Sequence, residues 1–166
     1  MKKGFIILFL LISQVILGQN DYLLAERYYR DGEFEKATQL YKVLFTKNPY
    51  NTTYLKRLLT SYQELSEFNT VENLLKKRLK SNPKHSYLLV ELGFNFDKQQ
   101  QKDSAIFYYN KAIKAIDKNN GMGGFMGRLF KENSLLDYAI VAYEKTMKSN
   151  PNANYKFQVA QIYGEK

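Results

Sequence analysis

Three prolines divide this chain at a regular interval, and that interval constrains the fold more than any other feature of the sequence. They are Pro49, Pro83 and Pro151, so their spacings of 34 and 68 residues are one and two lengths of a single period. Each proline follows an asparagine, in the phrases Lys47-Asn48-Pro49, Ser81-Asn82-Pro83 and Ser149-Asn150-Pro151. A fixed period of this length is typical of a repeat protein, in which each repeat stacks on its neighbours.

Other positions follow the same period. With proline at position 32, the repeats lie near residues 18–51, 52–85, 86–119 and 120–153, with a partial fifth near 154–166. The first half of each repeat carries a large apolar residue, then a small residue, then an aromatic ring. The large residues are Leu24, Leu58, Leu92 and Met126, the small ones Ala25, Gly93 and Gly127, and the rings Tyr28, Tyr62, Phe96 and Phe130. The second half has Ala37, Ala105 and Ala139, each followed four residues later by Tyr41, Tyr109 and Tyr143.

Each half repeat has the hydrophobic spacing of a short helix. Residues 22–30 and 34–46 carry apolar side chains three and four apart, and Asp31-Gly32 between them is a turn dipeptide. Later pairs are interrupted by polar residues at 66–67, 99–102 and 133–134, which we expect to cap the helix that follows. Proline is excluded from helix interiors, so each Asn-Pro predicts a loop before the next helix. The sequence therefore predicts an all-α fold of helix pairs.

This pattern resembles the tetratricopeptide repeat (TPR) family over essentially the whole chain after the first 18 residues. The resemblance implies a right-handed α-solenoid of antiparallel helix pairs, with about four repeats and the first helix of a fifth within residues 19–166. Some positions depart from the family pattern: the chain has no Trp, Asp117 replaces a proline, and Leu59 and Arg78 replace small residues. The second repeat, which holds two of these departures, is the least typical.

The N-terminal residues predict export. Met1-Lys2-Lys3 is a short basic leader, and Phe5 to Leu17 is an apolar run broken only by Ser13 and Gln14. This run is shorter than the ~20 residues that span a bilayer, so we interpret residues 1–18 as a signal peptide cleaved beside Gly18. No cysteine follows it to carry a lipid. We expect a periplasmic or secreted protein of the bacterial envelope, in contact with membrane only through the signal peptide.

Composition argues against an enzyme. The chain has no Cys and a single His, His85, so it lacks a thiol nucleophile and the usual soft metal ligands. We expect no catalytic residues, no metal and no cofactor. The glycines at 121–127 lack the Gly-Lys-Ser/Thr ending of a phosphate loop. We interpret this segment as a weak helix start, and Gly121 to Gly124 as a hinge or a flattened patch in the binding groove.

The charge is positive, but it is spread along the chain. The formal charge is +9, and loss of Lys2 and Lys3 with the signal peptide leaves 23 basic against 16 acidic residues, or +7. The basic run at residues 76–80 can either bind an anion or simply stabilise the end of a helix through the helix dipole. A secreted protein rarely meets nucleic acid, so we expect no nucleic-acid partner.

The resemblance implies that first helices line a concave groove that binds partners. Carrying over its contact positions gives Tyr22, Glu26, Tyr29, Arg30, Lys56, Thr60, Gln63, Tyr87, Val90, Phe94, Lys98, Arg128 and Lys131. Their mixed polar and aromatic character suits a protein or peptide. The alternative is that some of these aromatic side chains pack between neighbouring first helices. Glu26 also stands where carboxylate-clamping relatives have asparagine, which disfavours a C-terminal carboxylate as ligand.

We therefore expect an exported scaffold that binds a protein or peptide. The alternative is the N-terminal accessory region of a longer sensor or envelope enzyme. Residues 155–162 predict the first helix of a fifth repeat, and Lys166 follows before any second helix. Arrays normally end in a polar cap, so we expect either part of a longer array or a helix that is itself the cap. An uncapped helix here could also support self-association.

Overall fold

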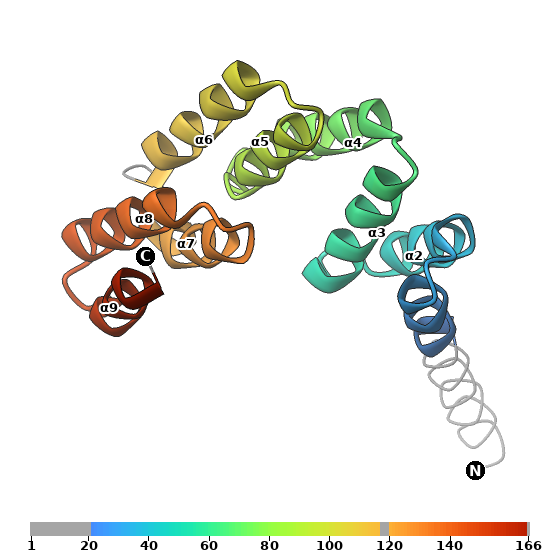
Figure 1. Ribbon diagram of the computed structural model, residues 1–166, viewed down its shortest axis with the longest axis horizontal. Helices are drawn as coiled ribbons and strands as arrows, with labels where there is room; N and C mark the ends of the chain where they lie inside the picture. Colours follow the sequence, from blue (N-terminus) through green and yellow to red (C-terminus); the bar gives the residue numbers. More distant parts are fainter. Residues whose placement is uncertain (1–20, 117–119, 166) are drawn as a thin grey trace, which may run out of the picture. The chain divides into compact units, whose positions relative to one another are not determined.

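A computed structural model of the protein describes residues 21–116 and 120–165, which form helices and turns without a strand (Figure 1). The predicted signal peptide lies outside the described residues. Residues 21–30 are helical. The helices that follow are α2 (Phe34–Lys47), α3 (Thr52–Glu64), α4 (Phe68–Ser81), α5 (Leu88–Lys98), α6 (Lys102–Ile116), the short η1 (Asn120–Met122), α7 (Gly123–Glu132), α8 (Leu136–Ser149) and α9 (Lys156–Glu165). No helix in this part of the chain is long and apolar enough to cross a membrane.

The described helices divide into two compact units between Glu67 and Phe68. The N-terminal unit contains the helix at residues 21–30, α2 and α3. The C-terminal unit contains α4 to α9, in which α5 packs on α6 and α7 packs on α8. The sequence predicts one array over residues 19–166, whereas the structure divides within the second repeat, between its two helices.

The all-α class and the pairing of helices are confirmed, and the fold is TPR-like. In the third and fourth predicted repeats, the two helices are joined by a short turn and pack on each other, so the members of these pairs run antiparallel. In the C-terminal unit, α5 also neighbours α7 and α6 neighbours α8. First helices therefore lie beside first helices, and second helices beside second helices.

The turn inside each repeat has one left-handed residue, and these residues also recur every 34 positions. They are Gly32, Ser66, Gln100 and Ser134, with φ of 75°, 60°, 61° and 60°. The residue after each one donates its N–H to the carbonyl five residues earlier, at 2.8 to 3.0 Å, as in Glu33 to Tyr28 and Leu135 to Phe130. This is a Schellman ending, which satisfies carbonyls that the helix end leaves open.

These turns correct one sequence expectation. The polar residue at 134 was expected to cap the helix that follows it. Instead Ser134 lies in the turn that follows α7, after the C-cap residue Asn133, and α8 begins after Leu135, whose side chain makes no capping hydrogen bond. The turn is set by backbone hydrogen bonds and a left-handed residue, so no side-chain cap is required there.

The turns between repeats confirm the expected role of the Asn-Pro phrases. The carbonyls of Asn48, Asn82 and Asn150 each accept a hydrogen bond from the residue three positions later, at 3.2, 3.0 and 2.9 Å. Proline stands second in each turn, where its fixed φ is favourable. In the first of these turns Asn51 then caps α3, its side chain accepting from the Tyr54 N–H at 3.1 Å.

Within the third and fourth repeats, a glycine of the first helix lies against a tyrosine ring of the second. A Cβ at Gly127 would lie 2.6 Å from the Tyr143 ring, and one at Gly93 would overlap the ring of Tyr109. Both tyrosines are buried. The missing side chain allows the two helices to approach closely. The second repeat has leucine at both positions, Leu59 and Leu75.

The other glycines at the start of α7 are also close-packed. Cβ atoms at Gly123 and Gly124 would collide with Thr146 and with the Tyr155 hydroxyl. Gly123 is buried, so it does not contribute to a flattened patch in the binding groove, and the hinge at Gly121 to Gly124 stays a prediction. Glycine is required here because a second helix and Tyr155 occupy the space of a side chain.

At the left-handed turn positions, substitution by alanine and substitution by glycine should change the stability of the protein in opposite directions. We expect Gly32→Ala to destabilise the protein by about 1 kcal/mol, because alanine resists the left-handed conformation. Ser134→Gly should stabilise it by roughly 0.5–1 kcal/mol for the converse reason. Urea unfolding followed by circular dichroism measures both. Equal stability of Ser134→Gly and wild type would contradict a left-handed residue at this turn.

The glycine–tyrosine contact predicts a coupled pair. Gly127→Ala should cost about 1–3 kcal/mol, because Tyr143 is buried and stacked on Tyr155 at 5.0 Å and has little room to move. Gly164→Ala is the matched control, since a Cβ there meets nothing within 4 Å. Tyr143→Leu should remove most of the penalty of Gly127→Ala in a double-mutant cycle. Additive effects would show that the two residues do not share this contact.

Candidate partner-binding surface

A charged cluster ties the first two repeats together in the N-terminal unit. The Arg57 guanidinium on α3 donates to both carboxylate oxygens of Glu26, from Nε at 2.8 Å and Nη2 at 3.1 Å. The same guanidinium lies 4.2 Å from the centre of the Tyr29 ring. The Tyr41 hydroxyl on α2 donates to Glu26 as well. Two helices of the first repeat and the first helix of the second therefore meet at one carboxylate.

The cluster is partly shielded from water. The Glu26 and Arg57 side chains are 17% and 34% exposed. Burial raises the pKa of Tyr41 far above its ordinary value, and the hydrogen bond to Glu26 raises it further, because ionising Tyr41 would place two negative charges together. The phenol stays neutral and remains a donor. A bidentate arginine–carboxylate pair with a third donor fixes the orientation of the Glu26 side chain.

Sequence reasoning missed Arg57, which lies outside the groove positions that the resemblance supplies. The two members of the ion pair are 31 residues apart, so no local spacing connects them. The sequence separation of Glu26 and Arg57 is close to one repeat length, and this spacing is the only sequence feature that points to the pair.

The charged cluster predicts a measurable coupling. Because the pair is bidentate and only partly exposed, we expect a coupling energy of about 1–2 kcal/mol between Glu26→Gln and Arg57→Ala in unfolding experiments. Lys36→Ala with Glu33→Gln is the control, an exposed ion pair three residues apart that should couple more weakly than Glu26 and Arg57. Similar couplings in both pairs would contradict the special role of the cluster.

Most predicted groove residues of the N-terminal unit contact their neighbours. The Tyr22 ring lies 5.6 Å from that of Tyr54, and Glu26 and Tyr29 both contact Arg57. Gln63 is only 5% exposed, so its assignment as a partner contact is wrong. Of the other candidates in this unit, Arg30 and Lys56 are exposed and Thr60 is half-buried.

In the C-terminal unit, two predicted groove residues are inside the protein. Val90 is fully buried and Tyr87 is 8% exposed, so neither side chain offers surface to a partner. The Tyr87 ring packs edge-on against Phe125 of the next repeat, 5.0 Å between centres. This confirms the alternative interpretation, in which some aromatic side chains join neighbouring first helices.

Two half-buried rings and two exposed cations of α5 and α7 form what we call the α5/α7 surface: Phe94, Lys98, Phe125 and Arg128. The Lys98 ammonium lies 5.7 Å from the centre of the Phe94 ring, and the Arg128 guanidinium 4.9 Å from that of Phe125. Lys98 is exposed and the Arg128 side chain is 62% exposed. Adjacent first helices thus each present a ring with a cation beside it.

Lys131 at the end of α7 has a partner within the unit. Its ammonium lies 2.9 Å from the Glu165 carboxylate of α9, one repeat further along. The contact joins the fourth and fifth first helices as Arg57 and Glu26 join the first and second. Lys131 therefore helps to hold α9 in place, and its contact with a partner stays a prediction.

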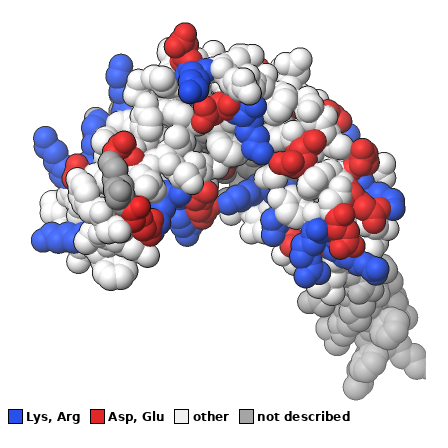
Figure 2. All heavy atoms as spheres, viewed as in Figure 1, with Lys and Arg blue, Asp and Glu red and all other residues white. Residues whose placement is uncertain are grey.

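Two residues of the basic run at 76–80 make contacts within the protein. Lys76 pairs with Glu72 one turn away on α4. Arg78 lies beside the Tyr87 hydroxyl, where it opposes the rise in the pKa of Tyr87 that burial causes. On the face shown in Figure 2, lysines and arginines are interspersed with acidic residues. These observations favour a structural role for the run over an anion-binding site.

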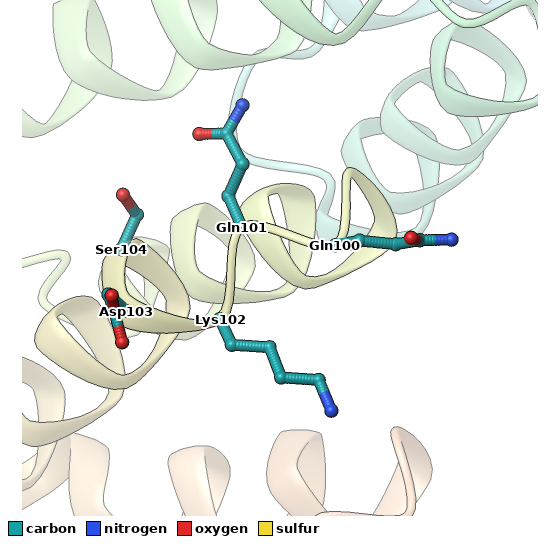
Figure 3. A pocket seen from close by; sticks show the side chains of 5 residues that line it. All are labelled: Gln100, Gln101, Lys102, Asp103 and Ser104. Carbon is teal, nitrogen blue, oxygen red and sulfur yellow. The ribbon is translucent and has the colours of Figure 1, made fainter.

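Other clusters that could carry chemistry are weak. A hollow of about 410 Å³ lies at the turn before α6, lined by residues 100–104. Gln101 and Lys102 point in opposite directions and Gln100 in a third, so the lining side chains do not converge on a ligand (Figure 3). Residues 21–116 and 120–165 hold no group of three His, Cys, Asp or Glu side chains placed to bind a metal ion.

Comparisons with known proteins add little beyond this geometry. No protein-family model matches the chain, and no curated protein matches it. Solved structures that resemble it include "MamA RS-1 ArsTM double mutant", 17% identical over 89% of this chain and 84% of that one, with a TM-score of 0.48. Another is BtubC from P. vanneervenii, 16% identical over 87% and 68% of the two chains, with a TM-score of 0.49. Such likenesses are too weak to assign a function.

Proposed function

We propose that this protein is an exported scaffold of the TPR family that binds a protein or peptide through its first helices. The basic leader and the apolar run of residues 5–17 support export to the periplasm or beyond the cell. The 34-residue register, shared by helices, prolines and left-handed turns, supports the family assignment. The α5/α7 surface is the contact that we assign to the partner.

The pairing of ring and cation on two adjacent helices carries this proposal. Aromatic and arginine side chains dominate the binding energy of protein interfaces, because they combine large apolar area with directed polar contacts. Rings at Phe94 and Phe125 can pack against apolar side chains of a partner, while Lys98 and Arg128 can donate hydrogen bonds to its carboxylates. The α5/α7 surface therefore suits a segment that carries both apolar and acidic residues.

Chemical crosslinking capture from an envelope extract tests this proposal. The bait protein is compared with a triple variant, Phe94→Ala, Lys98→Ala and Arg128→Ala. Loss of three central contacts should weaken a specific partner by at least about tenfold, at 1–2 kcal/mol for each strong contact. The partner should then be absent from the variant sample, and circular dichroism should show an unchanged fold.

The matched control is Ile106→Ala with Phe107→Ala, which removes exposed apolar area from α6 in the row of second helices. We expect this variant to capture the partner as the wild type does. Recovery of the same proteins at the same yield by all three baits would exclude the α5/α7 surface as the binding site.

A further inference from the structure

The face that each first helix turns toward its own second helix occupies fixed repeat positions, 4, 7, 8 and 11. In the fourth repeat, Gly123 and Gly127 lie against Thr146 and Tyr143 of α8, and Phe130 stacks on Tyr138. In the third repeat, Gly93 lies against Tyr109 of α6, and Phe96 stacks on Tyr108 at 5.3 Å. Met126 and Leu92, at position 7, are fully buried. A second helix covers this face in both repeats.

In α9 the same four positions are uncovered, and we call them the α9 face. They are Phe157, Ala160, Gln161 and Gly164, and all four are exposed. Phe157 is 76% exposed, and a Cβ on Gly164 would meet nothing within 4 Å. The equivalent Leu89 of α5 is 4% exposed. Within the described residues, no helix occupies the α9 face.

The rest of α9 is held firmly against the unit. Ile162 is fully buried, Tyr155 just before the helix stacks on Tyr143 at 5.0 Å, and Glu165 pairs with Lys131 at 2.9 Å. These contacts fix which side of α9 points outward. The α9 face is thus a preformed surface, and binding to it requires little reordering.

The α9 face is complementary to a second copy of itself. If two α9 helices cross antiparallel about a two-fold axis between Ala160 and Gln161, Phe157 of each copy lies opposite Gly164 of the other. The same operation places Lys156 opposite Glu165. A ring then fills the space of a missing side chain, as Tyr143 does at Gly127. We propose that two copies of this protein associate through their α9 faces.

Physical chemistry favours this arrangement over other pairings of the same helix. An isologous interface uses one patch twice and closes after two copies. A parallel crossing would place Lys156 opposite Lys156 and Phe157 opposite Phe157. The antiparallel crossing pairs opposite charges at both ends, and a carboxylate such as Glu165 can accept from Lys131 and from the second copy together. The interface uses none of the four residues of the α5/α7 surface, so it stands independently of the proposed partner site.

Cysteine crosslinking tests the proposal directly, because the natural chain has no cysteine. Ala160→Cys places a thiol next to the two-fold axis. Under mild oxidation this variant should form a covalent dimer, whereas Phe107→Cys, at an exposed site on α6, should stay largely monomeric. Equal yields for the two variants would overturn the α9 pairing, because random collision would explain both.

Analytical ultracentrifugation of the cysteine-free protein supplies the second measurement. Wild type should show a mass that rises from one copy toward two with concentration. Gly164→Leu fills the space that receives Phe157 while meeting nothing in its own copy, so it should raise the dissociation constant at least about tenfold with unchanged helicity. A monomer at all concentrations, or a dimer that Gly164→Leu leaves unchanged, would overturn the proposal.

Discussion

The close packing of the helix pairs depends on a position of the first helix that carries little or no side chain. In the third and fourth repeats, a glycine at position 8 lets its helix lie directly against a tyrosine ring at position 24 of the partner helix. Burial raises the pKa of both tyrosines, Tyr109 and Tyr143, which therefore stay neutral in the core. The first repeat has Ala25 and Tyr41 at these positions, and both are fully buried. Because one helix pair cannot bury its apolar face alone, this close approach also sets the surface on which the next repeat stacks.

The second repeat uses different residues, and the chain divides there into its two compact units. Leu59 and Leu75 replace the small residue and the ring, so the second repeat cannot form a glycine–tyrosine contact. Both leucines are buried, at 2% and 0% exposure, which shows that the positions still belong to the core.

The sequence predicts the helices of this fold well, because periodic spacing reports directly on local backbone and on the buried stripe. The sequence predicts the turns less well, because serine and glutamine seldom adopt a left-handed conformation, which Ser66, Gln100 and Ser134 do. Only Gly32 is of a residue type that indicates such a turn. The binding surface was predicted least. Repeat positions identify the side of a helix that faces the groove, but they do not show which side chains pack between neighbouring first helices. Tyr87 packs on Phe125 of the next first helix, Val90 is buried as well, and the Arg57 contact with Glu26 joins different repeats.

Self-association through the α9 face would strengthen partner binding, because a dimer carries two α5/α7 surfaces. Partner binding uses side chains of α5 and α7, whereas self-association uses side chains of α9, so the two surfaces share no residue. A dimer through the α9 faces carries two α5/α7 surfaces at a fixed separation. A partner that is itself repeated or anchored in an envelope layer would engage both surfaces, and its second contact would form at a high effective concentration. Modest affinity at each α5/α7 surface, as expected for four partly exposed side chains, would then be sufficient for stable attachment.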